Sequence, residues 1–309
     1  MWFISRNTLL GLGWAFVAIT VWSGSLVMLR LGVTTSLNAY DLTMLRFGVA
    51  TLILAPVALR RGSGTYRLGL TSLLGMVVAF GAPYVLLITV AMKSAPAAAA
   101  GALNPGVMAM VSVLLGRMMF GDRIGAAQLT GLLLTATGIF LFTLTGGAIT
   151  TGHLILVGTG TMWASYALIV RRAAVPALYA TAIVAVGSAI FYLPVYLAAL
   201  PKQILTAPIA DVVMQAGFQG VLVSVIAIYA FNRSAELLGA IAGATLPALI
   251  PVVTLGLGSL VLGEAAGSGE IVSAILVSMG LVLILVGIPA MRWLSNQSLR
   301  SLNKRGTPL

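Results

Sequence analysis

The chain has 309 residues, of which 60% are hydrophobic and only 7% are charged, and its formal net charge is +11. An ordinary soluble domain carries about 25% charged residues, so this composition excludes a soluble enzyme, a disordered chain and a secreted disulfide scaffold. Because Cys is absent and His153 is the single His, thiolate chemistry and a multi-histidine metal site are excluded too. The basic residues separate apolar stretches instead of forming one wettable face, which argues against nucleic acid as a partner.

Apolar stretches long enough to cross a membrane follow one another along the chain. A spanning helix needs about 20 mostly apolar residues, whereas barrel strands are shorter and alternate. The charge-free stretch 124–170 is long enough for two helices, divided at Gly146-Gly147. We therefore predict an all-α membrane protein with ten transmembrane helices, near 8–29, 40–59, 68–91, 95–116, 125–145, 153–170, 177–199, 212–231, 237–262 and 270–290.

The distribution of Lys and Arg predicts the orientation of these helices. Thirteen of the 17 basic residues fall in the tails and in the alternate loops on the same side, three fall in the other loops (Arg30, Lys93 and Lys202), and Arg46 lies within a helix. Cytoplasmic loops carry an excess of Lys and Arg, so both termini are expected in the cytoplasm of a bacterial-type inner membrane. The first segment is long and lacks a small-residue cleavage site, so it is read as a membrane span and not as a signal peptide.

The second half of the sequence repeats features of the first. A shift of 142 residues places Gly243 and Pro247 on Gly101 and Pro105, and Gly263-Glu264 on Gly121-Asp122; a shift of 141 places Trp163 on Trp22 and Arg171 on Arg30. We predict a five-helix repeat at 1–150 and a second at 151–309, which ends in a short basic cytoplasmic tail. Five is odd, so the second repeat is inverted, as is typical of secondary transporters, whose site lies near the midplane between the halves.

The order of several motifs identifies a family. Trp22 stands late in the first helix, Arg46 early in the second, Asn104-Pro105 within the fourth, and a Gly-acid pair before the fifth and tenth. This pattern resembles the EamA-type exporters of the drug/metabolite transporter superfamily over nearly the whole chain. The chain departs from the family at Ser23 and Ala164, where Gly often follows the Trp, and at Asp122, which is usually Glu. The resemblance implies a cavity formed by helices 1, 3, 4, 6, 8 and 9, and the aromatic amino-acid exporters are the most similar branch.

Aromatic and polar side chains inside the predicted helices are the candidate substrate contacts. An aromatic-lined cavity suits a flat apolar ligand by stacking and could hold a cation, although aromatics near helix ends also form the interfacial belt. Arg46 either attracts a substrate carboxylate or snorkels outward, near Asp41, and the amides either contact substrate or join helices. The predicted substrate-binding residues are Trp22, Tyr84, Asn104, Trp163, Tyr166, Gln215, Gln219 and Arg46.

Prolines and small residues predict where the helices bend and pack. Proline frees a backbone carbonyl and permits bending, so we predict hinges at Pro83, Pro105, Pro247 and Pro251. Small residues four apart, at Ala97/Gly101 and Gly239/Gly243, let helices approach closely in lipid. They serve either tight packing alone or a flexible pathway wall.

These observations predict a secondary transporter that exports small organic metabolites by alternating access, first among them amino acids with an aromatic or bulky apolar side chain. The alternatives are a multidrug or cationic-compound efflux carrier and, from another class, a metabolite channel. No acid is predicted at the midplane, which favours uncoupled export over proton coupling. The sequence contains neither a Walker motif nor a pair of Asp residues deep in the predicted helices, so it gives no indication of an enzyme. No cofactor is expected. The expected partners are a small-molecule substrate and the lipid bilayer; the oligomeric state stays open, and a monomer fits.

Overall fold

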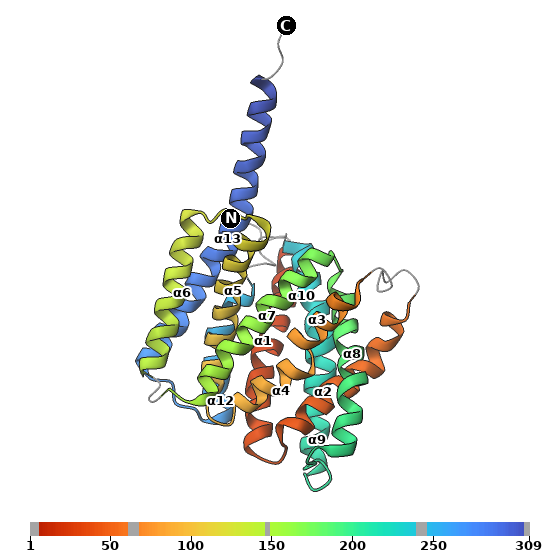
Figure 1. Ribbon diagram of the computed structural model, residues 1–309. Coiled ribbons are helices and arrows are strands. Elements are labelled where there is room, and N and C mark those ends of the chain that lie inside the picture. Colours follow the sequence, from red (N-terminus) through yellow and green to blue (C-terminus); the bar gives the residue numbers. More distant parts are fainter. Residues whose placement is uncertain (1–5, 61–67, 146–148, 239–245, 306–309) are drawn as a thin grey trace.

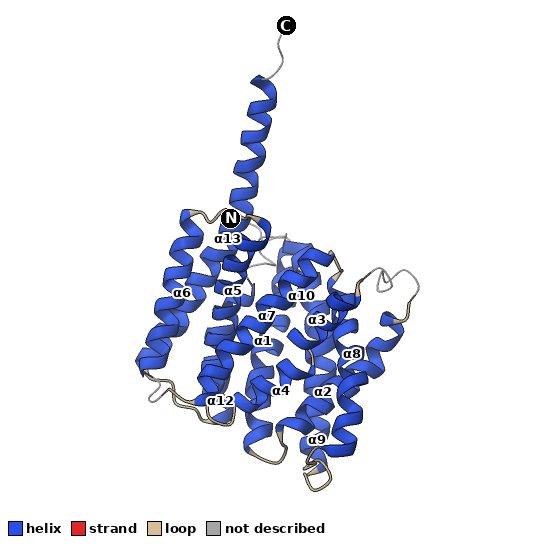
Figure 2. Cartoon of the chain, in the orientation of Figure 1, coloured by secondary structure: helices blue, strands red, loops and turns tan. Residues whose placement is uncertain are grey.

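The computed structural model describes residues 6–60, 68–145, 149–238 and 246–305, except for the side chains at 246 and 287–305. Within these ranges every regular element is a helix (Figure 2). The first half contains α1 (Arg6–Thr34), α2 (Ala39–Ala58), α3 (Leu70–Phe80), α4 (Ala82–Ala91), α5 (Ala97–Phe120) and α6 (Ala126–Thr145). The second half contains α7 (Thr151–Ala173), α8 (Ala177–Ala199), α9 (Ile209–Gln215), the π-helix η2 (Ala216–Ile226), α10 (Ala227–Leu238), the 3₁₀-helix η3 (Leu246–Leu249), α12 (Ile250–Leu262) and α13 (Ser268–Arg305).

The described helices account for the ten predicted spans. Nine are long and apolar enough to cross a membrane when α3 and α4 are counted as one span and α9, η2 and α10 as another. The remaining one is the shorter apolar stretch Pro247–Leu262. The predicted end of the eighth helix at 231 is wrong, because α10 continues to Leu238; Gly239 and Gly243 lie outside the described residues.

The two halves enter the bundle from opposite sides. In Figure 1, α1 begins on the side where α13 ends, whereas α7 begins on the other side. We call the side where α1 begins the terminal side and the other the distal side. The fifth spans of the two halves, α6 and α13, pack against each other at one edge of the molecule (Figure 1). Because α6 and α13 pair at this edge, the other helices surround the centre of the molecule.

Large apolar side chains project outward from the helices. Leu52, Met118 and Leu260 are each about four-fifths exposed, at 81%, 79% and 83%. Soluble proteins rarely expose broad apolar surfaces, so this coverage fits a protein whose solvent is lipid.

The third span of the first half is interrupted, although the sequence predicts a continuous helix over 68–91. α3 ends at Phe80, Gly81 adopts φ −91° and ψ −144°, and α4 begins at Ala82. A Cβ atom at Gly81 would lie 2.2 Å from the Oγ of Ser188 and 2.2 Å from the carbonyl oxygen of Val77. Only glycine therefore fits here, and the Oγ of Ser188 accepts a hydrogen bond from the Ala82 backbone N–H at 3.0 Å.

Asp41 fixes the distal start of α2. Asn38 and Asp41 form a reciprocal capping box, and the Asp41 carboxylate also accepts hydrogen bonds from the Tyr196 hydroxyl at 2.6 Å and the Gln203 backbone N–H at 3.0 Å. Asp41 is completely buried. Its bonds join α2 to the end of α8, and it forms no ion pair with Arg46.

Candidate functional site

A chamber of about 290 Å³ lies between the two halves. Ligand pockets commonly have volumes of about 300 to 1,000 Å³, so this one has room for a small metabolite. Its lining includes residues from the helix set that the family resemblance implies, and it also includes Arg46 and Phe47 of α2 and Val184 and Ala185 of α8. The second and seventh spans are therefore part of the wall, which corrects the implied set.

The chamber opens toward the terminal side. Ala177, where α8 begins on that side, lines the chamber and is exposed. Leu29 and Ile88, which line it near the distal ends of α1 and α4, are only 1% and 2% exposed. The distal end is thus closed by packed side chains.

Four aromatic side chains form one wall of the chamber. The rings of Phe80 and Tyr166 stack with centroids 4.5 Å apart and an interplanar angle of 11°. Phe80 also contacts the ring of Tyr84 at 4.8 Å and that of Trp163 at 5.7 Å. Stacked and tilted rings at these separations attract one another and present flat apolar faces. Phe80 ends α3 and Tyr84 lies in the first turn of α4, so these two rings come from either side of the break at Gly81.

Arg46 provides the positive charge of the chamber. It lies within α2 and lines the cavity. One of its Nη atoms donates to the side-chain oxygen of Gln219 at 3.4 Å, a long bond that leaves most of the five guanidinium N–H donors directed elsewhere. Its position between helices, and not at an interface, favours the interpretation that Arg46 attracts an anion over snorkelling.

The chain contains six Asp and Glu residues, and none of them lines the chamber. Each has a hydrogen-bonding or ionic partner elsewhere: Asp41 with Tyr196, Asp122 with Arg171, Asp211 with Ser36, Glu236 with Arg233, Glu264 with Arg30, and Glu270 with the Gly267 backbone N–H. Within the part of the chain that the structure describes, no carboxylate therefore serves as a counter-ion to Arg46.

Asn104 joins three helices at the chamber wall. Its side-chain oxygen accepts a hydrogen bond from the Tyr84 hydroxyl at 3.3 Å, and its amide nitrogen donates to Thr159 at 3.0 Å. The amide therefore joins α4, α5 and α7, as predicted for a helix–helix hydrogen bond, and Asn104 also lines the cavity, where its contact with substrate stays a prediction. Trp22 lines the chamber as well and packs against Phe231, with centroids 5.2 Å apart.

Gln215 and Gln219 join helices and do not line the chamber. Gln215 donates to the carbonyl oxygen of Met28 at 2.7 Å. Gln219 donates to the carbonyl oxygen of Ser25 and accepts from the Ser25 hydroxyl, both at 3.0 Å. Gln219 touches the site only indirectly, because its oxygen also accepts from Arg46 and so positions the guanidinium.

The predicted hinge prolines occupy different positions. Pro105 lies inside α5 and lines the chamber, and Pro83 lies in the first turn of α4, just after the break at Gly81. Pro247 lies in the 3₁₀-helix η3, and Pro251 lies in the first turn of α12, where a missing N–H leaves no helical bond unmade. Of the four, Pro105 alone interrupts a long described helix.

Sequence reasoning missed Phe80, the ring shared by every aromatic contact of the wall. Its signal was present, because Phe80 directly precedes Gly81 and Pro83, a combination that marks a helix interruption.

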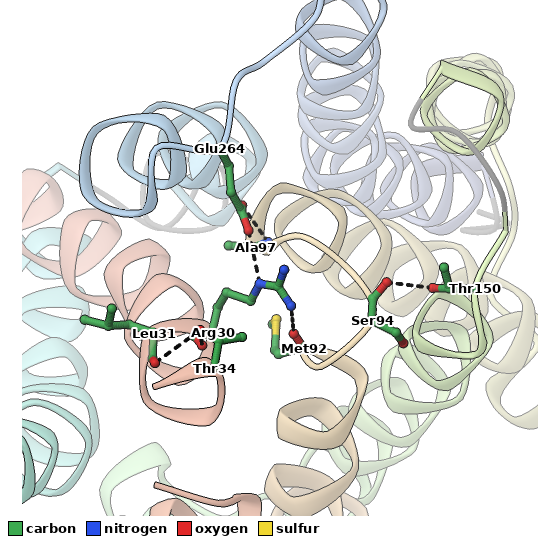
Figure 3. A network of polar contacts seen from close by, with 8 residues as sticks. All are labelled: Arg30, Leu31, Thr34, Met92, Ser94, Ala97, Thr150 and Glu264. Carbon is green, nitrogen blue, oxygen red and sulfur yellow. Dashed lines mark hydrogen bonds and ion pairs between the residues drawn. The ribbon is translucent and has the colours of Figure 1, made fainter. Parts of the chain in front are cut away.

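Two ion pairs lie at opposite ends of the bundle. On the distal side, Nε of Arg30 donates to Glu264 at 3.1 Å, an Nη of Arg30 donates to the carbonyl oxygen of Met92, and the other Glu264 oxygen accepts from the Ala97 backbone N–H at 3.0 Å (Figure 3). On the terminal side, Arg171 binds Asp122 with two hydrogen bonds of 2.6 and 3.0 Å.

Comparison with known proteins agrees with this architecture. The model of the EamA-like transporter family matches residues 9–144 and again residues 150–286. The chain belongs to this family, whose members are membrane transporters of small molecules and not enzymes.

A crystal structure of another protein superposes on 90% of this chain and 95% of its own length, with a TM-score of 0.61 and 22% sequence identity. At that identity the likeness concerns the fold alone. No curated protein matches the chain.

Proposed function

We propose that this protein is an alternating-access carrier that exports amino acids with an aromatic or bulky apolar side chain. One observation carries the proposal: an Arg without a protein counter-ion and an aromatic wall line the same small chamber. The guanidinium suits a substrate carboxylate, which it can bind with two parallel hydrogen bonds. The rings of Phe80, Tyr166 and Trp163 suit a flat side chain.

The symmetry of the fold supports the proposal of alternating access. Inverted repeats give a carrier two related arrangements, each open to one side of the membrane around a fixed central site. The chamber open toward the terminal side corresponds to one of them. The excess of Lys and Arg on the terminal side supports the proposal that this side faces the cytoplasm of a bacterial inner membrane.

The absence of a carboxylate from the chamber lining weighs against the alternative function, efflux of cationic compounds. A cation in this chamber would face the Arg46 charge with only neutral groups to compensate it. Binding to ring faces contributes about 0.5 to 2 kcal/mol, and repulsion from a nearby guanidinium opposes it.

Counterflow in liposomes tests the proposal. Purified protein is reconstituted with an internal load of unlabelled phenylalanine, leucine or tetraphenylphosphonium, and accumulation of the labelled compound is followed. We expect saturable accumulation for the two amino acids and none for the cation. Accumulation of the cation alone would support efflux of cationic compounds, and unsaturable flux without counterflow would indicate a channel.

A further inference from the structure

The chamber offers a charged group to a carboxylate and none to an ammonium group. Given the proposed carrier function, we infer that the substrate class is aromatic monocarboxylates, with or without an amino group. The argument concerns which parts of an amino acid the lining residues can recognise.

The carboxylate has a built site. Burying a charge is costly unless the charge is paired or solvated. Among the described residues, Arg46 has only the neutral Gln219 as a hydrogen-bonding partner. Since the side chains of all six Asp and Glu residues are engaged elsewhere, a bound anion is the group that can compensate the charge of Arg46 in the chamber.

The ammonium group has no equivalent site. An ammonium ion has three donors to satisfy. The amide oxygens of Asn104 and Gln219 already accept hydrogen bonds, the first from Tyr84 and the second from Ser25 and Arg46. The other polar groups that line the chamber, among them the amide of Asn232 and the hydroxyls of Thr181, Ser224 and Tyr166, are uncharged. Removing the amino group from a substrate should therefore reduce its affinity only slightly, whereas removing the carboxylate leaves the charge of Arg46 without a counter-ion.

Two phenylalanine analogues separate these contributions. 3-Phenylpropionate lacks only the amino group and phenethylamine lacks only the carboxylate, so each is tested as a competitor of labelled phenylalanine counterflow. We expect 3-phenylpropionate to compete within about threefold of phenylalanine and phenethylamine to be at least about thirtyfold weaker, as expected for a charge-assisted pair. Arg46→Gln should remove most of this difference.

The inference would be overturned if phenethylamine competed as strongly as 3-phenylpropionate, or if 3-phenylpropionate did not compete although phenylalanine counterflow is observed. Either result would leave the carrier function intact. If phenylalanine itself shows no counterflow, the amino-acid proposal fails. In that case, counterflow of labelled 3-phenylpropionate is measured directly. Counterflow would support the monocarboxylate inference, and no counterflow would overturn it.

A second inference concerns the distal end and rests on different residues. Arg30, Glu264, the Met92 carbonyl and the Ala97 N–H form the network drawn in Figure 3, which we call the distal clasp. It joins α1 and α5 of the first half to the loop before α13 of the second half. The Arg30 and Glu264 side chains are only 23% and 22% exposed.

The repeat supports a mechanical role for this network. Arg171 and Asp122, which the internal repeat aligns with Arg30 and Glu264, form the ion pair at the terminal end, so each pair connects the first span of one half to the loop before the fifth span of the other. Both loops leave the preceding helix in the same way, through Gly121 at φ +67° and Gly263 at φ +66°. Left-handed backbone of this kind favours glycine, and it sets each acid in place for its pair.

We propose that the distal clasp holds the distal end of the chamber shut and must separate for substrate to leave on that side. Leu29 and Ile88, which close this end, lie on the two elements that Arg30 connects, since α4 ends next to Met92. Breaking the clasp should therefore favour opening at the distal end without changing the residues that line the chamber.

The natural absence of cysteine permits a direct test that needs no transported substrate. Ile88→Cys is introduced alone, and its labelling by a membrane-impermeant maleimide is measured from each side of oriented vesicles. Adding Glu264→Gln should raise the ratio of distal to terminal labelling at least about fivefold. The repeat-related change Asp122→Asn is the matched control and should not raise it.

Arg30→Lys provides a second variant should Glu264→Gln fold poorly. It keeps the charge but cannot donate from a planar fork to Glu264 and the Met92 carbonyl together, so an intermediate rise in the labelling ratio is expected. An unchanged ratio in the folded variants, or an equal rise in Asp122→Asn, would show that the clasp does not close the distal end.

Discussion

The two halves of the molecule are alike at their ends and different at the centre. Arg30 and Glu264 on one side have their counterparts in Arg171 and Asp122 on the other. Near the chamber the correspondence is lost: the shifts of 141 and 142 residues place Gly187 and Ser188 on Arg46, so the second half has no charged counterpart of this residue. The repeated parts therefore form the framework that both halves share, and the unrepeated parts give the chamber its chemistry.

The largest expected effect comes from removing the charge of Arg46. Arg46→Val removes the only charged side chain among the residues that line the chamber. We expect counterflow of carboxylate substrates to fall by about 100-fold or more, because charge-assisted hydrogen bonds contribute about 1.5 to 3 kcal/mol each. Val184→Ala, on the facing helix, is the control and should change the rate only a few-fold. Near-normal transport by Arg46→Val would show that the asymmetry is not what binds substrate.

Gly81→Val should produce the next largest effect, this time on folding. The new Cβ atom would overlap the Val77 carbonyl and the Ser188 hydroxyl, and overpacking commonly costs about 1 to 3 kcal/mol, occasionally more. A lower melting midpoint in detergent is expected. Gly158→Val on α7, where a Cβ atom would meet nothing within 4 Å, should leave the midpoint nearly unchanged, and equal losses in both variants would contradict the role of the break.

Asn104→Leu tests the second asymmetry, since the repeat aligns Asn104 with Leu246. The change leaves the Tyr84 hydroxyl without its acceptor, whereas the Thr159 hydroxyl loses one donor and still donates to the Leu156 carbonyl. An unsatisfied buried group costs about 1 to 3 kcal/mol. We expect a loss of stability together with a higher KM. A raised KM at unchanged stability would assign Asn104 to substrate contact alone.

Phe80→Ala should weaken binding moderately. The ring contacts Tyr84, Trp163 and Tyr166, and an aromatic pair contributes about 0.5 to 1.5 kcal/mol beyond burial, so a rise in KM of about three- to tenfold is expected with phenylalanine. Trp14→Ala removes an edge-to-face contact with Tyr229, centroids 5.4 Å apart, that does not line the chamber. That control should leave KM unchanged.

Pro105→Ala is expected to have the smallest effect. It restores a backbone N–H within α5 and should slow turnover a few-fold if the helix bends there during transport. Pro247→Ala, in the 3₁₀-helix η3, is the repeat-related comparison. Unchanged turnover in both folded variants would remove the hinge hypothesis.

Much of this architecture can be predicted from the sequence, because a helix that crosses lipid must be apolar over a fixed length. Apolar length predicts the spans, and the alignment of Arg30 with Arg171 and of Asp122 with Glu264 predicts the repeat. Side-chain partners are harder to predict, since they depend on packing between distant helices. The sequence predicts that Gln219 lies on a polar face of its helix. It does not predict that Gln219 forms a hydrogen bond with Ser25, which is 194 residues away in the sequence. The break at Gly81 depends on the approach of Ser188 from α8, a contact that local propensity does not contain.

The lack of any Asp or Glu in the chamber lining has an electrical consequence. A monocarboxylate that lacks an amino group crosses the membrane as a single negative charge, whereas a zwitterionic amino acid carries none. Cells hold their interior negative, and moving one elementary charge through a potential of 100 mV is worth about 2.3 kcal/mol. Under the proposed function, outward movement of such an anion would be driven by the resting voltage itself, so its export against a concentration gradient would need no coupling ion.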